Sequence, residues 1–491
     1  MTSPTLLTDS NAVSSPLLTG KTVFVETLGC QMNVNDSELM MGLLEAEGLK
    51  VTFDPLKADL LMINTCQIRG HSEDKAYSYL GKWGALKRQR PHIKIAMAGC
   101  VAQQAKDSVF KRAPYVDMVV GTQNIADLPA MVKEAFAGGT HILRTDRQKD
   151  RSTYDFTVDV APRRDNTVSA WVTIIEGCDY FCTYCVVPYT RGRQISRSSE
   201  SILAEVKDLA GFGFKEITLL GQTVDSYGRD FKDQQYGLAN LLHELNDIDG
   251  LERIRFMTSH PLDMTDAIID AIADLPKVME YIHIPMQSGD DTVLERMKRG
   301  YTSQQYFDLV DKIRDRVPNV GISGDYIVGF PGETDAQFEK SVESVTRTKV
   351  NAANTAAYSA RKQTPAGLWE EREQGAIPDS VKQERLKILN DAITAQTAAN
   401  NRAFDGQTVE VLVEGRSRRN PDRLMGRMRN NTVVNLDPPP ASPTFSHEKY
   451  TWVDEMEHRL VGKIIPVTIT EPFPYSLVGQ VAESYTLPEA P

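Results

Sequence analysis

The sequence predicts an α/β protein in three parts: an N-terminal parallel α/β domain, a central partial (βα)6 barrel and a small C-terminal all-β barrel. Strand-like and helix-like segments alternate through the first two parts, and six such units follow one another in the second. The last part has short apolar runs broken by glycine and proline, which is typical of a small β-barrel. A length of 491 residues fits several domains, because one hydrophobic core rarely exceeds about 250–300 residues.

The N-terminal domain is expected over residues 21–137. Its predicted strands, TVFVETLG, DLLMINT, IKIAMAG and VDMVVGT, alternate with helix-like stretches such as DSELMMGLLEAEG. Strands joined by helices in this way pair in parallel. The Ser/Thr-rich residues 1–20 are expected to be a disordered lead, and the polar residues 138–164 a linker.

The central domain is expected over residues 165–402. Its predicted strands begin at Trp171, Glu216, Arg253, Tyr281, Gly321 and Asn354. In barrels of this type the chemistry takes place at the carboxyl ends of the strands. The C-terminal domain is expected over residues 404–485, with the strands TVEVLVEG, KIIPVTITE and SLVGQVAES.

The N-terminal segment and the lack of long apolar runs favour a protein of the reducing cytoplasm. The N-terminus has neither the basic segment of a secretory signal nor the arginines of a transit peptide. No apolar run approaches the ~18–20 residues that span a bilayer, so we expect a cytoplasmic protein with no membrane partner. Disulfides are rare in the cytoplasm, and metal or catalytic roles gain weight for the six cysteines. The net charge of −11 argues against a nucleic-acid partner overall, but local basic patches can still bind one.

Half of the six cysteines lie within eight residues, in the stretch GCDYFCTYCVVPYTRG. Cys178, Cys182 and Cys185 follow the first predicted strand of the central domain, at the mouth of the predicted barrel. Thiolates suit zinc or iron–sulfur clusters. Structural zinc usually takes four ligands, and no fourth Cys or His is nearby. Three ligands on a four-iron cluster leave one iron open to a substrate, so the sequence favours the cluster over zinc with a distant ligand.

The other cysteines each follow a predicted strand of the N-terminal domain. Cys30 ends TVFVETLG, Cys66 ends DLLMINT and Cys100 ends IKIAMAG, each at the start of a predicted helix. The carboxyl ends of parallel strands share one edge, so we expect these thiols to meet there. Helix N-termini favour thiolate over thiol. The pattern predicts a second iron–sulfur cluster with one open iron, and unrelated buried cysteines are the alternative.

Longer stretches carry a resemblance to a known family. They are TLGCQMNVNDSE, NTCQIRG, AGCVAQQ, VVGTQN, EGCDYFCTYCVVPYTRGRQISR, GQTVDSYG, IPMQSGDDTVLERMKRGYT and GDYIVGFPGETDAQF. Together they resemble the radical S-adenosylmethionine methylthiotransferases, and among these the branch of tRNA 2-methylthio-N6-dimethylallyladenosine synthases. Three departures, QTVDSYG, MTSHP and YSARKQTPA, stand where the branch commonly has NVNAY-like, TSPHP-like and YSPRPGTPA sequences.

The resemblance implies two [4Fe–4S] clusters and S-adenosylmethionine as cofactors. In the reaction that the resemblance implies, one S-adenosylmethionine donates a methyl group to sulfur on the second cluster, and another yields the radical that removes hydrogen from C2 of an adenine. The residues implied to bind S-adenosylmethionine are Tyr184, Gly221, Gln222, Asp325 and Gly329, with Gly332 and Glu333 beside them. Tyr184 is implied to pack on the adenine of the cofactor. His260 and His283 are expected to be core residues rather than catalytic bases.

The C-terminal domain holds an arginine-rich stretch, GRSRRNPDRLMGRMRNN. The arginines expected to contact RNA are Arg416, Arg418, Arg419, Arg423, Arg427 and Arg429. A solvated hairpin rim is the alternative. Position and strand pattern resemble the TRAM domain, and the family implies the anticodon loop of tRNA as partner. The resemblance also implies the target, an isopentenylated adenosine just 3′ of the anticodon. We also expect an electron-donor protein as a partner, and a monomer.

Two other functions remain open at this point. One is the same chemistry on threonylcarbamoyl-adenosine of tRNA or on an aspartate of a ribosomal protein. The other is a zinc-stabilised RNA-binding protein without catalysis.

Overall fold

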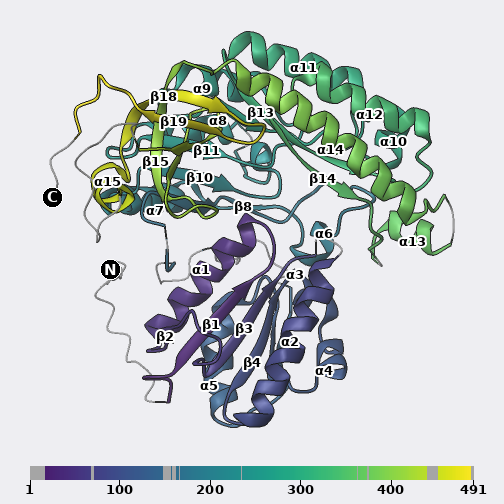
Figure 1. Cartoon of the computed structure of the whole chain (residues 1–491). Coiled ribbons are helices and arrows are strands. Elements are labelled where there is room, and N and C mark those ends of the chain that lie inside the picture. The colour runs from purple at the N-terminus through teal and green to yellow at the C-terminus, as the bar shows by residue number, and fades with distance from the viewer. Residues whose placement is uncertain are drawn as a thin grey trace.

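The computed structural model describes residues 17–67, 71–147, 156, 162–164, 166–233, 235–361, 363–372, 375–438 and 452–487. In Figure 1 the N-terminal domain lies below the central domain, and the C-terminal strands lie beside the central domain at the upper left. The mixed α/β architecture predicted from the sequence is therefore confirmed.

The N-terminal domain is a parallel sheet of six strands in the order β2-β1-β3-β4-β5-β6. The strands are β1 (Thr22–Thr27), β2 (Lys50–Val51), β3 (Leu60–Thr65), β4 (Lys94–Gly99), β5 (Met118–Val120) and β6 (Ile142–Arg144). The helices are α1 (Gln31–Ala46), α2 (His71–Gln89), α3 (Cys100–Ala105), α4 (Ser108–Arg112) and α5 (Leu128–Phe136). One apolar cluster packs α1 and α5 on one face of the sheet, and another packs α2, α3 and α4 on the other. This burial of both faces explains why the central strands read as continuous apolar runs.

Two features at the ends of the N-terminal domain were not expected from the sequence. Strand β6 pairs with β5, so the expected linker 138–164 begins with an edge strand of the N-terminal sheet. Its three residues are too few to show a periodicity. At the other end of the domain, Leu18 is fully buried in the core, although residues 1–20 were expected to be a disordered lead. Residues 1–16 lie outside the described part of the chain.

The central domain has six parallel strands at the six predicted places. One sheet has the order β11-β10-β7 and the other the order β12-β13-β14. The strands are β7 (Ser169–Thr173), β10 (Glu216–Leu220), β11 (Arg253–Phe256), β12 (Tyr281–His283), β13 (Gly321–Val328) and β14 (Ala352–Ala357). A single parallel bridge between Ile254 and Val278 joins the two sheets. The result is a partial barrel, as predicted.

Helices surround this barrel. They are α7 (Ser199–Gly211), α8 (Leu238–Asn246), α9 (Asp266–Asp274), α10 (Asp291–Arg296), α11 (Ser303–Arg316), α12 (Asp335–Thr348), α13 (Pro365–Glu371) and α14 (Asp379–Arg402). Several begin at a side chain that accepts a hydrogen bond from the first turn, as Thr302 and Thr334 do in capping boxes. These caps fix where each helix starts, and hence how the preceding loop leaves its strand.

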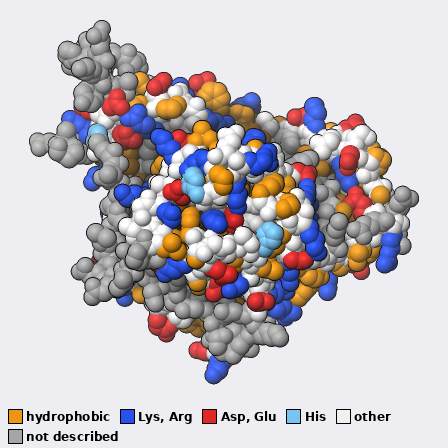
Figure 2. All heavy atoms as spheres, turned by 90° about the horizontal axis from the view of Figure 1, so that it is seen from below, with side chains coloured by type: hydrophobic (Ala, Val, Ile, Leu, Met, Phe, Trp, Pro, Cys, Tyr) orange, Lys and Arg blue, Asp and Glu red, His pale blue; other side chains and the backbone are white. Residues whose placement is uncertain are grey.

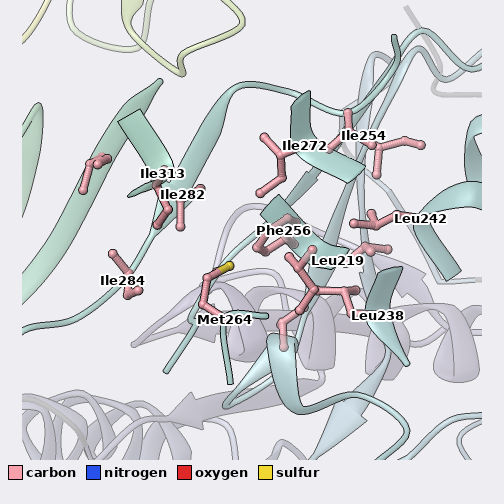
Figure 3. Packing of buried hydrophobic residues seen from close by; sticks show 14 of the residues in the cluster. Leu219, Leu238, Leu242, Ile254, Phe256, Met264, Ile272, Ile282, Ile284 and Ile313 are labelled. Atoms are coloured by element: carbon pink, nitrogen blue, oxygen red, sulfur yellow. The ribbon is translucent and has the colours of Figure 1, made fainter. Parts of the chain in front are cut away.

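The barrel core lies between strands and helices. Figure 3 shows Leu219, Ile254 and Phe256 of the strands facing Leu238 and Leu242 of α8. Because strand side chains alternate, the residues between these point to the opposite face. That face is polar: it includes Glu216, Thr218, Arg253 and Arg255, all buried.

The C-terminal domain is a closed barrel of five strands in the order β15-β16-β17-β19-β18. The strands are β15 (Thr408–Arg416), β16 (Leu424–Arg427), β17 (Val433–Leu436), β18 (Ile464–Pro472) and β19 (Leu477–Val481), with helix α15 (Trp452–Leu460) packed against the core. The three predicted runs correspond to β15, β18 and β19. Strands β16 and β17 were missed because they lie within and just after the arginine-rich stretch.

The C-terminal barrel docks on the amino ends of the central strands. Arg429 donates to both carboxylate oxygens of Glu280 at 2.7 and 2.9 Å, and to the carbonyl of Val278. Arg253, fully buried, donates to the carbonyl of Arg427 at 2.7 Å. The end of the central barrel opposite the cysteine loop is therefore covered by the C-terminal domain.

Two surface properties complete the description. None of the helices in the described part of the chain combines the length and the apolar character that crossing a membrane requires. Figure 2 shows the molecule from below, where Lys and Arg side chains are interspersed with Asp and Glu side chains. The described atoms of this face thus form no continuous basic field.

Candidate active site

The first cysteine triad lies on a loop framed by a short hairpin. Strands β8 (Ile175–Glu176) and β9 (Ile195–Ser196) pair antiparallel, and the loop between them carries Cys178, Cys182 and Cys185. Gly177 begins the loop with φ 78°, and a Cβ there would lie 2.3 Å from the carbonyl oxygen of Arg193. Only glycine fits this turn, which starts the loop at the carboxyl end of the first barrel strand.

Each of the first two thiols of this triad contacts a polar side chain. Cys178 Sγ lies 3.3 Å from Thr223 Oγ1, and Cys182 Sγ accepts a hydrogen bond from Arg299 Nη1 at 3.3 Å. Burial, together with the neighbouring Cys182, raises the pKa of the Cys185 thiol to about 12. Such thiols keep their protons until a metal displaces them, which is the behaviour of a buried metal-binding set.

The second triad assembles from three separate strand ends, as predicted. Cys30 caps α1, Cys66 follows β3 and Cys100 is the first residue of α3. The side chains of Cys30 and Cys66 are hydrogen-bonded, and this bond is the largest influence that lowers the pKa of Cys30 to about 6. Cys100 lies close enough to Cys30 for the two charges to interact. The structure therefore brings these residues to one edge of the sheet.

The expected preference of helix N-termini for thiolate holds for one residue of this triad only. Cys30 follows the expectation, since backbone hydrogen bonds from Met32 and Asn33 contribute to its lowered pKa. Burial raises the pKa of Cys100 instead, because desolvation outweighs the helix. Cys66 does not begin a helix directly, since α2 starts at His71.

Glycines let the strand ends approach each other in the second triad. Gly29, with φ 143°, would place a Cβ 2.4 Å from Cys66 Cβ. Gly99, with φ 88°, would place one 2.4 Å from both Asn64 Oδ1 and the carbonyl of Thr65. Glycine therefore precedes Cys30 and Cys100 because the backbone beside these thiols leaves no room for a Cβ atom.

A single metal ion and a four-iron cluster make different demands on the spacing of the thiols. Among the described residues, no three Cys, His, Asp or Glu side chains converge closely enough to hold one metal ion. Structural zinc requires such convergence, because all of its thiolates bind one atom at about 2.3 Å. In a four-iron cluster each thiolate binds a different iron and the sulfurs stay apart.

Arg191 connects the two triads, and it was not singled out from the sequence. Its guanidinium donates to Glu176 at 3.0 and 3.1 Å and to Asp36 Oδ2 at 2.5 Å. It is also hydrogen-bonded to Cys100. Arg191 follows α6 (Val187–Thr190), which contacts α3. Burial raises the pKa of Glu176 to about 7, and the neighbouring Arg191 opposes this rise.

The residues expected to bind S-adenosylmethionine lie around the carboxyl ends of the barrel strands. A Cβ on Gly221 would lie 3.0 Å from Ile175, and Gln222 Oε1 is buried without a partner in the described structure. An unpaired buried acceptor is costly, so a ligand that donates to Gln222 fits this place. Tyr184 packs beside the buried Phe330 and Tyr358. Contact of these residues with the cofactor stays a prediction.

The residues of GDYIVGFPGET have clear roles in the fold itself. Gly329 and Gly332 have φ of 71° and 77°, and Cβ atoms there would collide with Lys382 and Arg296. Glu333 accepts from the Gly329 N–H at 2.7 Å and pairs with Arg385 at 2.8 Å. The turn alone accounts for these residues, and their contact with adenosine stays a prediction.

Asp325 and the two histidines form polar contacts inside the barrel. His283 Nε2 lies 3.3 Å from Asp325 Oδ2, and Asn354 donates to the same carboxylate at 3.0 Å. Burial opposes ionisation, but His283 and Asn354 outweigh it and hold the pKa of Asp325 below its usual value. His260 stacks on Tyr180 with ring centroids 3.9 Å apart, and burial lowers its pKa to about 2.

The departures from the family pattern lie next to the cysteine triads. Thr223, of QTVDSYG, contacts Cys178, and the carboxylate of Asp225 accepts the backbone N–H of His260 in MTSHP. These two departures therefore touch each other. In YSARKQTPA, Arg361 lies near Cys66, and Gln363 lines a hollow of about 700 Å³ beside α3 and α6.

The arginine-rich stretch forms a hairpin whose arginines face different ways. Arg416 pairs with Asp454 and Glu457, Arg423 with Asp437 and Arg427 with Glu414. Arg429 is engaged with the central domain. Arg418 and Arg419 are exposed and have no ion-pair partner among the described residues. Contact of the six arginines with RNA stays a prediction, and these two are the best placed for it.

A partial (βα)6 barrel with three cysteines on the loop after its first strand defines a radical S-adenosylmethionine protein. Family models match residues 22–121 (uncharacterized protein family UPF0004), 172–345 (Radical SAM superfamily) and 402–482 (TRAM domain). Two curated relatives, the "tRNA-2-methylthio-N(6)-dimethylallyladenosine synthase" of Clostridium botulinum strains Loch Maree and Okra, are 41% identical over 459 residues. The alignments cover 93% of this chain and 96% of each relative. The chain belongs to the family of tRNA-2-methylthio-N(6)-dimethylallyladenosine synthases.

Solved structures share the fold at low sequence identity. The radical S-adenosylmethionine methyltransferase TsrM from Kitasatospora setae matches with a TM-score of 0.52 and 16% identity, over 72% of this chain and 78% of that one. The cobalamin-dependent S-adenosylmethionine radical enzyme OxsB matches with a TM-score of 0.51 and 13% identity, over 74% of this chain and 56% of that one.

Proposed function

We propose that this protein attaches a methylthio group to C2 of N6-dimethylallyladenosine next to the anticodon of tRNA. One observation carries the proposal. Cys30, Cys66 and Cys100 come from three separate strand ends to one edge, and Arg191 links that edge to the loop of Cys178, Cys182 and Cys185. A transfer of sulfur to an unactivated carbon requires a sulfur-bearing centre beside a radical-generating one.

We assign one [4Fe–4S] cluster to each triad. When bound, these clusters and S-adenosylmethionine supply the one-electron chemistry that breaks a C–H bond beyond the reach of acid–base groups. The chain's own residues bind these groups, orient them and exclude water. Cys178, Cys182, Cys66 and Cys100 are buried, and Cys30 and Cys185 are half-buried, so each triad is mostly shielded from water.

The tRNA is positioned by the C-terminal domain in this proposal. Arg418 and Arg419 project from the loop between β15 and β16 and are free to meet phosphates of the RNA backbone. An unpaired loop base enters a protein site at lower cost than a paired one, because less stacking and pairing is lost. A protein that donates electrons is the second partner.

The test is the nucleoside content of tRNA from a strain without this gene. We expect N6-dimethylallyladenosine to accumulate without its methylthio group, and a plasmid copy to restore the modification. A Cys66→Ala copy should not restore it. Persistence of the methylthio group in the deletion strain would overturn the proposal. It would direct attention to threonylcarbamoyl-adenosine or a ribosomal protein as target.

A further inference from the structure

Arg299 is a buried arginine that points at the first cysteine triad. Arg299 is 6% exposed, and its Nη1 donates a hydrogen bond to Cys182 Sγ at 3.3 Å. Neither Cys178 nor Cys185 has a charged side chain as a hydrogen-bond donor in the described structure. Thr223 and the backbone N–H of Tyr180 are the groups beside Cys178.

The chain around Arg299 is held in place on both sides. Helix α10 ends at Arg296, Lys298 takes a left-handed φ of 60°, and the N–H of Arg299 returns to the carbonyl of Leu294 at 3.0 Å. This is a Schellman-type ending, which turns the next side chain back toward the barrel. Thr183, between two cluster-loop cysteines, donates its N–H to Met297 and its hydroxyl to Arg296. The arginine and the cysteine loop are therefore fixed to each other.

No carboxylate of the described residues is hydrogen-bonded to Arg299, although Asp325 and Asp225 lie close enough for their charges to interact with its guanidinium. Its other donors go to neutral oxygens: Nε to Tyr301 Oη at 3.0 Å and Nη2 to the carbonyl of Pro285 at 3.4 Å. Arg191 differs, since it is buried against two carboxylates. A buried guanidinium that is not directly paired with an anion is costly. Among the groups hydrogen-bonded to Arg299, the sulfur of Cys182 is the one that would supply a negative charge, as a metal-bound thiolate.

A fixed positive charge of this kind acts on redox equilibrium. Reduction of an iron–sulfur cluster adds one negative charge. A guanidinium nearby and an N–H···S hydrogen bond both stabilise the reduced form more than the oxidised one. Low exposure keeps water from screening the effect. Arginine stays charged throughout the working pH range, so the influence is constant.

We propose that Arg299 sets the reduction potential of the cluster held by Cys178, Cys182 and Cys185, making that cluster easier to reduce. The inference rests on the proposed function, because the cluster assignment is part of it. In the step concerned, one electron passes from a reductant to the cluster, and no bond forms or breaks. Arg299 is a positioning and electrostatic residue here, acting through Cys182.

The experiment is an anaerobic redox titration of the full-length, cluster-loaded protein, followed by electron paramagnetic resonance with mediator dyes as reductant. The signal to follow is the one that changes when S-adenosylmethionine is added. Arg299→Gln should lower the equilibrium constant for reduction at least tenfold, which moves the midpoint potential by 59 mV or more to the negative side. Arg299→Lys keeps the positive charge, and its midpoint potential should lie between those of the unmodified protein and Arg299→Gln. Lys298→Gln removes the same charge from an exposed neighbour and should leave the potential unchanged.

Iron and sulfide content are measured on the same samples. A wild-type midpoint in an Arg299 variant that keeps its iron and sulfide overturns the proposal. Loss of this cluster from both Arg299 variants, with Lys298→Gln intact, also overturns it and makes Arg299 a residue for retaining the cluster. Absence of the signal from the unmodified protein would instead contradict the cluster assignment, which is the failure of the proposed function.

Discussion

Arg191 and Asp36 are 155 positions apart in the sequence, and their guanidinium and carboxylate are 2.5 Å apart across the junction of two domains. Asp36 lies on α1 behind Cys30, and Arg191 comes six residues after Cys185. A single buried ion pair therefore ties the helix of one triad to the loop of the other.

Replacing Arg191 by methionine should destabilise the protein by about 3–5 kcal/mol, because Asp36 and Glu176 remain buried without their cation. Thermal unfolding of the variant measures this. Arg193→Met is the matched control: its ion pair with Asp179 is 54% and 25% exposed and contributes no more than about 1 kcal/mol. Equal losses of unfolding free energy in both variants would show that the buried ion pair of Arg191 stabilises the protein no more than the exposed ion pair of Arg193.

Replacing Cys30, Cys66 or Cys100 by alanine should abolish sulfur insertion and leave reductive cleavage of S-adenosylmethionine in place. The iron content should fall from about eight to about four atoms per chain, since one four-iron cluster remains. Product nucleoside and 5′-deoxyadenosine are measured together. Cys178→Ala is the counterpart and should stop cleavage. Loss of cleavage in the Cys66 variant would contradict this division of roles.

Asp225 should give the folded protein a pH dependence that Asp225→Asn removes. Burial raises the pKa of Asp225 to about 8, whereas an unfolded aspartate has a pKa of about 3.9. Between these values the folded state binds the extra proton, so its stability falls as pH rises from about 4 to about 8. The slope reaches at most about 1.4 kcal/mol per pH unit. Unfolding measured over this range should show a shallower slope for Asp225→Asn. Identical slopes would mean that Asp225 is already ionised at low pH.

Neutralising Arg418 and Arg419 together should weaken tRNA binding without lowering stability, because neither is paired in the described structure. Each lost phosphate contact should reduce the slope of log affinity against log salt by about one. Arg416→Gln is the control, since its guanidinium is already paired with Asp454 and Glu457. Binding assays at several salt concentrations measure this slope. An unchanged slope in the double variant would show that the RNA does not contact Arg418 and Arg419.

Arg429→Met should loosen the C-terminal barrel from the central domain. The variant loses the hydrogen bonds to Glu280 and to the carbonyls of Pro276 and Val278, at a cost of about 1–3 kcal/mol. Faster proteolysis of the connection between α14 and β15 should report the separation. A wild-type cleavage rate would show that other contacts suffice to hold the domain.

The strands and the cysteine edge were predictable because their signals are local. Apolar runs such as DLLMINT mark buried parallel strands, and parallel pairing puts Cys30, Cys66 and Cys100 at one edge whatever the helices between them do. Strands β2 and β6 are too short to show a period. Strand β16 was hidden because it lies within the arginine-rich stretch, which reads as a charged surface, and β17 has only four residues.

The partners of the buried arginines could not be predicted from the sequence. Arg191 and Arg299 stand inside quoted stretches, VVPYTRG and RMKRGYT, yet nothing local distinguishes a buried arginine from an exposed one. Their partners lie as far as 155 and 117 positions away. The same holds for Arg427 and Arg429: spacing marked them as a basic surface, and only the folded chain shows that they pair with Glu414 and Glu280.

The docking of the C-terminal barrel on the amino ends of the central strands changes how truncations have to be interpreted. Asn431 and the carbonyl of Arg427 complete the hydrogen bonds of Arg255 and Arg253, which are buried within the central domain. A shortened chain that stops before β15 would open these guanidinium groups to water from beneath. Inactivity of such a fragment would then report a damaged scaffold as much as a missing RNA contact, and point substitutions on the outer loop are the cleaner instrument.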